Sequence, residues 1–252
     1  MKPLQVIGTP VSPFVRKVLV CLELKSLPYE IDPVVAFYTD EGFEHVNPLR
    51  LIPVLQDETT TLSDSTVICE YLEDAYPGYA LLPAEPNQRA KARWLEEYSD
   101  TYLADILIWK LFNEAVINPS VWGADRNIPS IKRIIEEDVP KALTYLEQIL
   151  PDTVFLYGDM GLADIAIATQ FRNAEMARFH LSDVDWPVTS AFIDRTLESE
   201  AFQKLAPIED VLISTPIAEQ RSKLAAMNVP LVSQSFMSDN PPKSGPMTKR
   251  TP

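Results

Sequence analysis

The sequence predicts an α/β domain followed by an all-helical domain. Strand and helix patterns alternate at the start of the chain in the order β-α-β-α-β-β-α. A polar, Pro-rich stretch between Leu82 and Pro86 interrupts this alternation, and strand patterns all but disappear after it. We therefore expect one domain over residues 1–82, a helical domain over residues 86–215, and an extended tail over residues 216–252.

The first domain begins with a strand, a helix and a second strand, which together have the size of a βαβ unit. Leu4–Ile7 reads as a buried strand, Pro13–Leu24 as a helix with one apolar face, and 29–34 as the second strand. A short helical segment over 37–46 follows, and then a hairpin of 54–56 with 61–62. A clear helix begins at Asp64.

The second half of the chain carries helical patterns of different length and burial. We expect helices over 90–116, 131–149, 161–178, 187–197 and 201–205, and a loop over 118–129. Pro140 lies inside the second of these patterns and should kink it or split it near Val139. The third is nearly all apolar and should lie at the centre of the helical core.

Composition narrows the classes of function. The net charge of −14 argues against nucleic acid or an anionic membrane as the main partner. No apolar run is long enough to span a bilayer and no signal-peptide core precedes the first strand, so we expect a cytoplasmic protein. Cys21 and Cys69 both lie in apolar helical patterns, where small buried hydrophobes are typical. With two Cys and two scattered His, we expect no metal site.

The stretch from Gly8 to Val18 joins the first strand to the first helix. Pro13 suits the first position of a helix and Ser12 the N-cap. Ser12 as a plain cap is one interpretation. The other is that its hydroxyl and the free N–H groups of the helix start hold an anion such as a thiolate.

Four motifs in a fixed order carry a resemblance to a known family. They are Ser12-Pro13-Phe14-x-x-Lys17-Val18, Asn47-Pro48 followed by Arg50-Leu51-Ile52-Pro53-Val54-Leu55, Leu62-Ser63-Asp64-Ser65-Thr66-Val67-Ile68-Cys69-Glu70-Tyr71-Leu72, and Gly158-Asp159-Met160-Gly161-Leu162-Ala163-Asp164-Ile165. Together they resemble a cytosolic glutathione transferase, and the first is similar to the serine-type catalytic motif of the tau and related bacterial classes. The resemblance spans about Leu4 to Leu205 and implies a thioredoxin-like first domain.

The resemblance implies a role for each motif residue. Ser12 would donate its hydroxyl to the glutathione sulfur, and Ile52, before a cis Pro53, would pair its backbone with the peptide. Asp64 would meet the ammonium group of glutathione, and Ser65 the γ-glutamyl carboxylate. Arg50 would meet the glycyl carboxylate, with His45 as a second choice. The implied glutathione-binding set is Ser12, Phe14, Arg50, Ile52, Pro53, Asp64 and Ser65.

Simpler roles stay open for several of these residues. Asp64 and Ser65 suit a plain helix cap, Arg50 a solvated surface, and Pro53 a trans bond. A pocket for the second substrate is expected against Phe14, Tyr102, Ile106 and Trp109, although an aromatic stripe at this spacing is more often core.

The sequence departs from the family pattern at two points. Arg50-Leu51 replaces the usual Gly-Lys, which leaves the glycyl contact open. Gly161 stands where Ser or Thr usually caps the core helix, so that only Asp164 can complete the cap, by accepting from the Gly161 N–H.

The implied function is conjugation of glutathione, as co-substrate, to electrophilic apolar small molecules by a homodimer. Two alternatives stay open. One is glutathione-dependent thiol transfer or reduction, although the classes that catalyse it have Cys where this chain has Ser12. The other is a binding or regulatory module that keeps the fold without catalysis.

Overall fold

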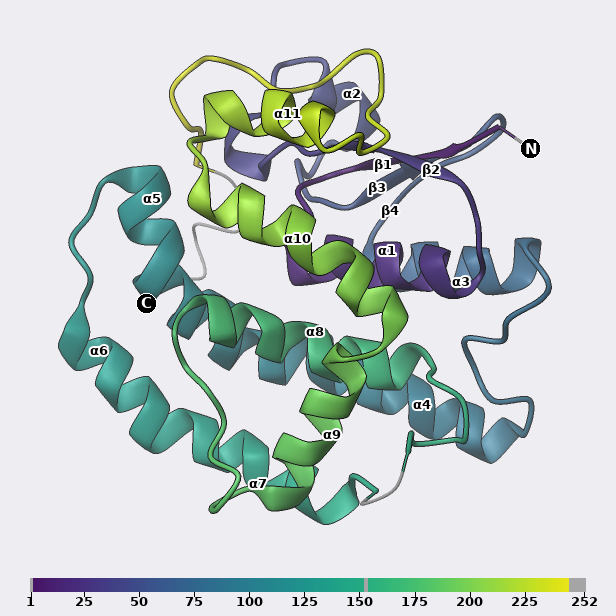
Figure 1. Ribbon diagram of the computed structural model, residues 1–252, viewed down its shortest axis with the longest axis vertical. Helices are drawn as coiled ribbons and strands as arrows, with labels where there is room; N and C mark the ends of the chain where they lie inside the picture. The colour runs from purple at the N-terminus through teal and green to yellow at the C-terminus, as the bar shows by residue number, and fades with distance from the viewer. Residues whose placement is uncertain (1, 152–153, 245–252) are drawn as a thin grey trace. The chain divides into compact units, whose positions relative to one another are not determined.

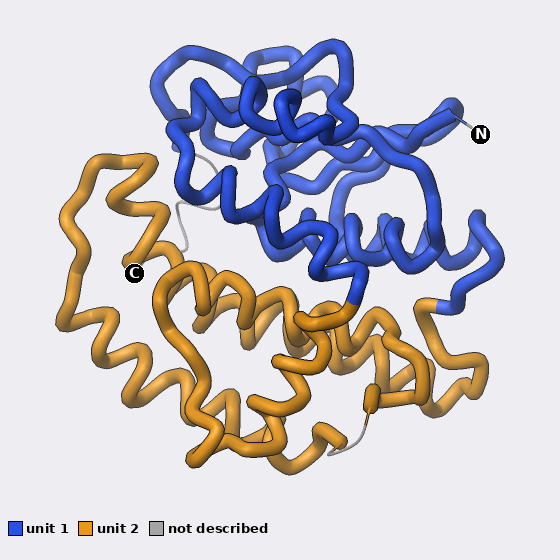
Figure 2. The backbone as a smooth tube through the Cα atoms, in the orientation of Figure 1, with its two compact units in different colours: residues 1–80, 200–250, 252 blue, residues 81–199, 251 orange. Residues whose placement is uncertain are grey.

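The computed structural model describes residues 2–151 and 154–244, and the chain divides into two compact units (Figure 1, Figure 2). Of the described residues, the first unit combines 2–80 with 200–244, and the second combines 81–151 with 154–199. The boundary near residue 80 lies close to the predicted linker. The grouping differs from the predicted bounds in one respect, because residues 200–215 pack with the first unit.

A four-stranded mixed sheet forms the centre of the first unit (Figure 1). Its strands are β1 Leu4–Ile7, β2 Tyr29–Asp32, β3 Val54–Gln56 and β4 Thr61–Ser63, in the order β2-β1-β3-β4. β1 pairs in parallel with β2 and antiparallel with β3, and β3 and β4 form the predicted hairpin. β2 ends two residues earlier than predicted, before Pro33, which has no N–H to continue a ladder.

Helices α1 Pro13–Leu24 and α3 Ser65–Ala75 pack against each other beside the sheet, and the bounds of α1 are those predicted. The helix predicted over 37–46 was wrong as a single element. It consists of two short turns, η1 Ala36–Tyr38 and α2 Phe43–Val46, because the Asp40 carboxylate accepts from the Phe43 N–H at 3.0 Å and starts a new turn there.

The C-terminal part of the chain corrects the prediction of an extended tail over 216–252. Helix α10 runs over Glu200–Ser214, well beyond the predicted 201–205, and packs on α1. It is followed by α11 Ile217–Ala226 and by a segment that crosses the first unit. The apolar residues here, such as Leu224 and Phe236, are widely spaced, so their contacts with distant parts of the chain leave no local period. The last part of the predicted tail, 245–252, lies outside the described residues.

Helices make up the second unit. They are α4 Pro86–Tyr98, the π-helical η2 Ser99–Leu103 and η3 Asp105–Ile117, α5 Asn118–Trp122, α6 Ile128–Arg133, the π-helical η4 Ile134–Asp138, α7 Val139–Ile149, α8 Leu162–Met176 and α9 Pro187–Leu197. The irregularity predicted near Val139, a kink or a split, lies where the π-helical η4 gives way to α7, and Pro140 lies in the first turn of α7. The predicted loop over 118–129 was wrong in part. It holds α5 and the start of α6, whose cap Asn127 accepts from the Ser130 N–H at 3.1 Å.

The N-terminus of α8 explains the unusual Gly161. The carbonyl of Leu81 accepts from the Leu162 N–H at 2.8 Å, so a backbone oxygen takes the place of the missing side-chain cap. A Cβ on Gly161 would lie 2.8 Å from that same carbonyl oxygen. As expected, the Asp164 carboxylate accepts from the Gly161 N–H, also at 2.8 Å. Gly161 is therefore required by the close approach of Leu81.

Candidate functional site

The register of the sheet brings the three motif loops of the first unit together. Ile7, the last residue of β1, pairs with Val54, the first residue of β3, and Val54 pairs with Ser63, the last residue of β4. The Ser12 turn follows β1, the Ile52–Pro53 bond precedes β3, and Asp64 follows β4. All three therefore lie at the same end of the sheet.

Gly8 makes the close approach between the first two loops possible. Its φ is +141°, a conformation that favours glycine, and a Cβ there would lie 2.9 Å from the Cβ of Ile52 and 2.6 Å from Cγ2 of Val15. The chain leaving β1 thus lies directly against Ile52.

Ser12 occupies the N-cap of α1, as predicted, but its side chain makes no capping hydrogen bond. Its backbone carbonyl accepts from the Arg16 N–H at 2.9 Å, which is the first hydrogen bond of the helix. The residue is half-buried at the positive end of the helix dipole. The hydroxyl is thus not used to close the helix, which argues against the interpretation of Ser12 as a plain cap.

The first turns of α1 also contain a buried cation that sequence reasoning missed. Arg16 is fully buried, forms an ion pair with Glu209 of α10, and lies 3.4 Å from the carbonyl of Val11, the residue before Ser12. It therefore ties the Ser12 turn to α10. The available signal was the charged pair Arg16-Lys17 on an otherwise apolar helix.

The Ile52–Pro53 peptide bond is cis, which confirms the prediction. Pairing with β1 starts only at Val54, so Ile52 lies just outside the ladder. Its side chain is half-buried and packs against the cluster of Ile7, Phe43 and Val54.

Asp64 is the N-cap of α3 and accepts from the N–H groups of Thr66 at 2.9 Å and Val67 at 3.2 Å. Its φ of 80° is unusual for a residue with a side chain and costs roughly 1–3 kcal/mol. Asp64 is exposed, while Ser65, the first residue of α3, is buried. The capping role of Asp64 is thus real, and it leaves the carboxylate accessible to a ligand.

Arg50 lies beside the same loops, with φ 52° and a side chain that is mostly covered. Its guanidinium lies 3.3 Å from the Thr39 hydroxyl and 3.7 Å from a Glu44 carboxylate oxygen. It is therefore not the freely solvated cation that one interpretation expected. His45 lies on α2, one residue after Glu44.

The residues predicted for the second-substrate pocket fall in both units. Phe14 is half-buried in the first unit, whereas Ile106 and Trp109 are buried in the second. Tyr102 is 43% exposed, and its ring packs on that of Tyr98 at a centroid distance of 5.5 Å. The shared pocket stays a prediction.

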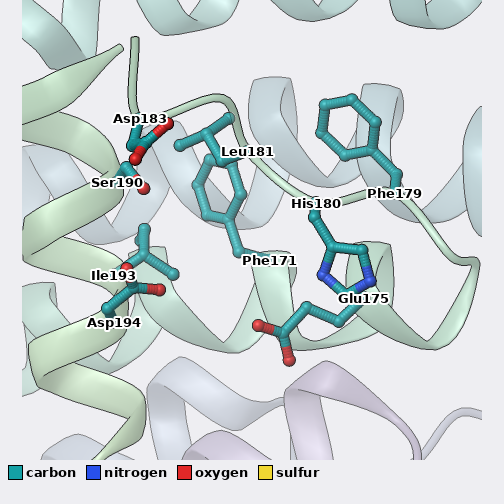
Figure 3. A pocket seen from close by; sticks show the side chains of 9 residues that line it. All are labelled: Phe171, Glu175, Phe179, His180, Leu181, Asp183, Ser190, Ile193 and Asp194. Atoms are coloured by element: carbon teal, nitrogen blue, oxygen red, sulfur yellow. The ribbon is translucent and has the colours of Figure 1, made fainter.

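A separate cavity of about 210 Å³ lies within the second unit, between α8, α9 and the loop that joins them (Figure 3). Apolar side chains, three carboxylates, a histidine and a serine line it: Phe171, Glu175, Phe179, His180, Leu181, Asp183, Ser190, Ile193 and Asp194. None of the predicted site residues is among them.

Within residues 2–151 and 154–244, no group of three or more His, Cys, Asp or Glu side chains is placed to hold a metal ion. In the same ranges, no helix has the length and apolar character needed to cross a membrane.

Comparisons with known proteins point to one family. Residues 11–75 match the family described as "Glutathione S-transferase, N-terminal domain". A maleylacetoacetate isomerase of Pseudomonas aeruginosa is 33% identical over 76% of this chain and 90% of its own length. A glutathione S-transferase of Triticum aestivum is 28% identical over 79% of this chain and 91% of its own. The crystal structure of a glutathione S-transferase from Rhodospirillum rubrum superposes with a TM-score of 0.72 at 28% identity, over 80% of this chain and 91% of that one.

Fold, motif geometry and relatives together define a glutathione-dependent enzyme with a thioredoxin-like sheet domain and a helical domain. The chain belongs to the glutathione S-transferase family. The predicted fold class and family are thereby confirmed.

Proposed function

We propose that this enzyme binds glutathione at the end of the sheet where the three motif loops meet and uses Ser12 to stabilise the thiolate for attack on an apolar electrophile. The observation that carries the proposal is the Ser12 hydroxyl, which stands at a helix N-terminus and makes no capping hydrogen bond.

The chemistry follows from the pKa of the thiol. A free cysteine thiol titrates near 8.5, so most glutathione at neutral pH is protonated and a poor nucleophile. A hydroxyl that donates to the sulfur, together with the helix dipole, favours the charged form. The thiol proton leaves to solvent, and Ser12 keeps its own proton throughout. The sulfur lone pair then forms the new C–S bond, while the electrophile either expels its leaving group or shifts its double-bond electrons onto the activating group, and the adduct then takes a proton from solvent.

The remaining motif residues suit the rest of the peptide. The backbone of Ile52 lies just outside the ladder, where an extended peptide can pair with it as an added strand. Asp64 offers a carboxylate to the ammonium group, and the start of α3 at Ser65 suits the γ-glutamyl carboxylate. Arg50 supplies a local cation for the glycyl carboxylate in a protein of net charge −14.

A second candidate reaction is cis–trans isomerisation. Two relatives above 30% identity, from Pseudomonas aeruginosa and Rattus norvegicus, are named maleylacetoacetate isomerase. Isomerisation begins with the same step, because a thiolate adds to an activated double bond, the new single bond rotates, and elimination releases the thiolate. In conjugation the glutathione adduct is released as the product. In isomerisation the adduct eliminates glutathione and releases the isomerised substrate.

The structure argues against thiol transfer by a protein cysteine. Such chemistry needs an accessible thiolate, and the only two cysteines, Cys21 and Cys69, are both buried.

The serine-type, tau-like and bacterial subclass is supported by Ser12 and the motif around it. We also propose that residues 1–82 contain the glutathione-binding residues, and that a homodimer works in the cytoplasm with no metal, nucleic acid or membrane partner. The second-substrate pocket against Phe14, Tyr102, Ile106 and Trp109 belongs to the same proposal.

Calorimetry with glutathione and steady-state kinetics separate these functions. Saturable binding together with conjugation of an aromatic halide supports the transferase. Turnover of a cis-enedione without consumption of glutathione supports the isomerase instead. Binding without turnover of either substrate would leave only the binding module, and no binding would contradict the glutathione site itself.

A further inference from the structure

The segment after α11 extends the sheet of the first unit. β2 is an edge strand, and its residue Ile31 donates its N–H to the carbonyl of Pro230 at 2.9 Å and accepts from the Val232 N–H at 3.2 Å. Leu231 thereby forms a parallel bridge with Ile31. The segment covers an edge that would otherwise present unpaired backbone groups.

A buried carboxylate fixes the next part of this segment. Asp32 is fully buried at the end of β2 and accepts from the Ser235 hydroxyl at 2.5 Å and the Phe236 N–H at 2.8 Å. The Arg221 guanidinium of α11 lies 3.7 Å from the same carboxylate. A buried carboxylate that accepts hydrogen bonds from Ser235 and Phe236 holds the segment in one place.

The segment then runs beside residues 37–40, which lie in the loop region between β2 and β3. The Asp40 N–H donates to the carbonyl of Phe236 at 2.8 Å, the Ser238 N–H to that of Tyr38 at 2.7 Å, and the Lys243 N–H to that of Phe37 at 2.8 Å. This pairing supplies regular backbone hydrogen bonds to a region that otherwise contains only two short helical turns.

Side chains connect the segment to residues of the candidate site. The ring of Phe236 packs on Phe43 at a centroid distance of 5.7 Å, and Phe236 and Ile52 both pack against the core cluster that contains Phe43. Met237 forms an antiparallel bridge with Thr39, and the buried Thr39 hydroxyl lies 3.3 Å from the guanidinium of Arg50. The segment thus supports Arg50, which is proposed to meet the glycyl carboxylate, and Ile52, whose backbone is proposed to pair with the peptide.

We propose that Pro230–Lys243, named here the C-terminal strap, positions the 36–53 loop for glutathione binding, with Ser235 and Phe236 as its positioning residues. The inference rests on the proposed function and adds to it a part of the chain that the family motifs do not reach. The strap acts on affinity for glutathione and leaves the activation of the thiol to Ser12, because its contacts reach Arg50 and Ile52.

Full-length Phe236→Ala tests the strap. A loop that adopts the binding geometry only part of the time raises the apparent Kd by the inverse of that fraction. We expect the Kd and KM for glutathione to rise roughly three- to tenfold, while kcat at saturating glutathione and its pH profile stay as in the unsubstituted protein. Ser235→Ala should move KM in the same direction, and Ser235→Thr, which keeps the hydroxyl, should restore it.

Leu205→Ala is the matched control, because Leu205 is a buried residue of α10 in the same unit. It should lower thermal stability without changing the KM for glutathione. Amide hydrogen exchange at Asp40 gives a second readout. The exchange rate of the Asp40 N–H should rise in Phe236→Ala and not in Leu205→Ala.

Two results would overturn the strap alone: an unchanged Kd for glutathione in Phe236→Ala, or an equal rise in Leu205→Ala. Failure of the unsubstituted protein to bind glutathione would overturn the proposed function and the strap together.

Discussion

At the scale of single residues, Ser12 and Asp64 stand in the same position, each immediately before a helix, and use it differently. Asp64 accepts two backbone N–H groups, whereas the Ser12 side chain accepts none. Sequence alone does not separate these cases, since both residue types favour the N-cap. Ser12, with φ −67° and ψ 127°, has the extended backbone that is usual for an N-cap and still makes no side-chain cap, whereas Asp64 caps its helix from an unusual φ of 80° and ψ of 124°.

Ser12→Ala should lower turnover without weakening the binding of glutathione. A lost hydrogen bond to a charged group costs roughly 1.5–3 kcal/mol, which corresponds to a drop of roughly ten- to a hundredfold in rate. The Kd for glutathione should stay close to that of the unsubstituted enzyme, because Ile52, Asp64 and Arg50 hold the rest of the peptide. Steady-state kinetics and calorimetry measure the two quantities, and full activity in the variant would remove the Ser12 hydroxyl from the proposed mechanism.

Asp64→Asn should weaken glutathione binding with little loss of stability. Asn keeps an oxygen that can cap α3 but has no charge for the ammonium group, so we expect the Kd to rise about tenfold. Glu85→Gln is the matched control, because Glu85 caps α4 by accepting from the Gln88 N–H. An equal affinity in Asp64→Asn and the unsubstituted protein would assign Asp64 to capping alone.

At the scale of elements, α1 was predictable to its ends because Ser12-Pro13 marks its start and the apolar period stays uninterrupted to Leu24. The end of α8 that carries Gly161 was not predictable in the same way. Its cap is the carbonyl of Leu81, about eighty residues away along the chain, and no local pattern encodes that contact.

Gly161→Ser, which restores the usual family residue, should therefore destabilise the protein. Its Cβ would lie 2.8 Å from the Leu81 carbonyl oxygen, and overpacking of this kind typically costs about 1–3 kcal/mol. Chemical denaturation measures the change. A more stable Gly161→Ser protein would show that the side-chain hydroxyl is the better cap here.

Asp164 should make stability depend on pH. Its burial raises the pKa of the carboxyl to about 6, although the N–H groups of Leu156 and Gly161 oppose the rise. Between about pH 4 and pH 6, Asp164 keeps a proton in the folded chain that it has lost in the unfolded chain. The contribution of Asp164 to the free energy of unfolding therefore falls by about 3 kcal/mol as the pH rises through this range. Asp164→Asn should flatten the slope in unfolding experiments across that range. The exposed Asp159→Asn should leave it unchanged, and an equal slope in both variants would contradict the assignment.

At the scale of the whole molecule, the order of elements and the position of the site were predictable, because strands, helix starts and motifs are local in sequence. The grouping of the C-terminal chain with the first unit was not. Leu231, Ser235 and Phe236 each meet a different partner near the start of the chain, so their pairing has no period of its own. The strap is therefore defined by long-range contacts that exist only in the folded chain.

The proposed homodimer is tested by light scattering of the full chain at micromolar concentration. We expect twice the mass of one chain, because soluble homo-oligomers are most often two-fold dimers. A single-chain mass at that concentration would contradict the dimer and leave the proposed glutathione site unaffected.

The central claim is that Ser12 stabilises the thiolate of bound glutathione, and a pH titration of the thiolate absorbance in the complex tests it most directly. In the unsubstituted protein the thiolate should form at a pH below that of free glutathione. In Ser12→Ala the midpoint should rise by roughly one to two pH units, which is the lost hydrogen bond expressed as a pKa change. Ser12→Thr, which keeps the hydroxyl, should titrate close to the unsubstituted protein. Coincident titrations of the unsubstituted and Ser12→Ala complexes would contradict the claim.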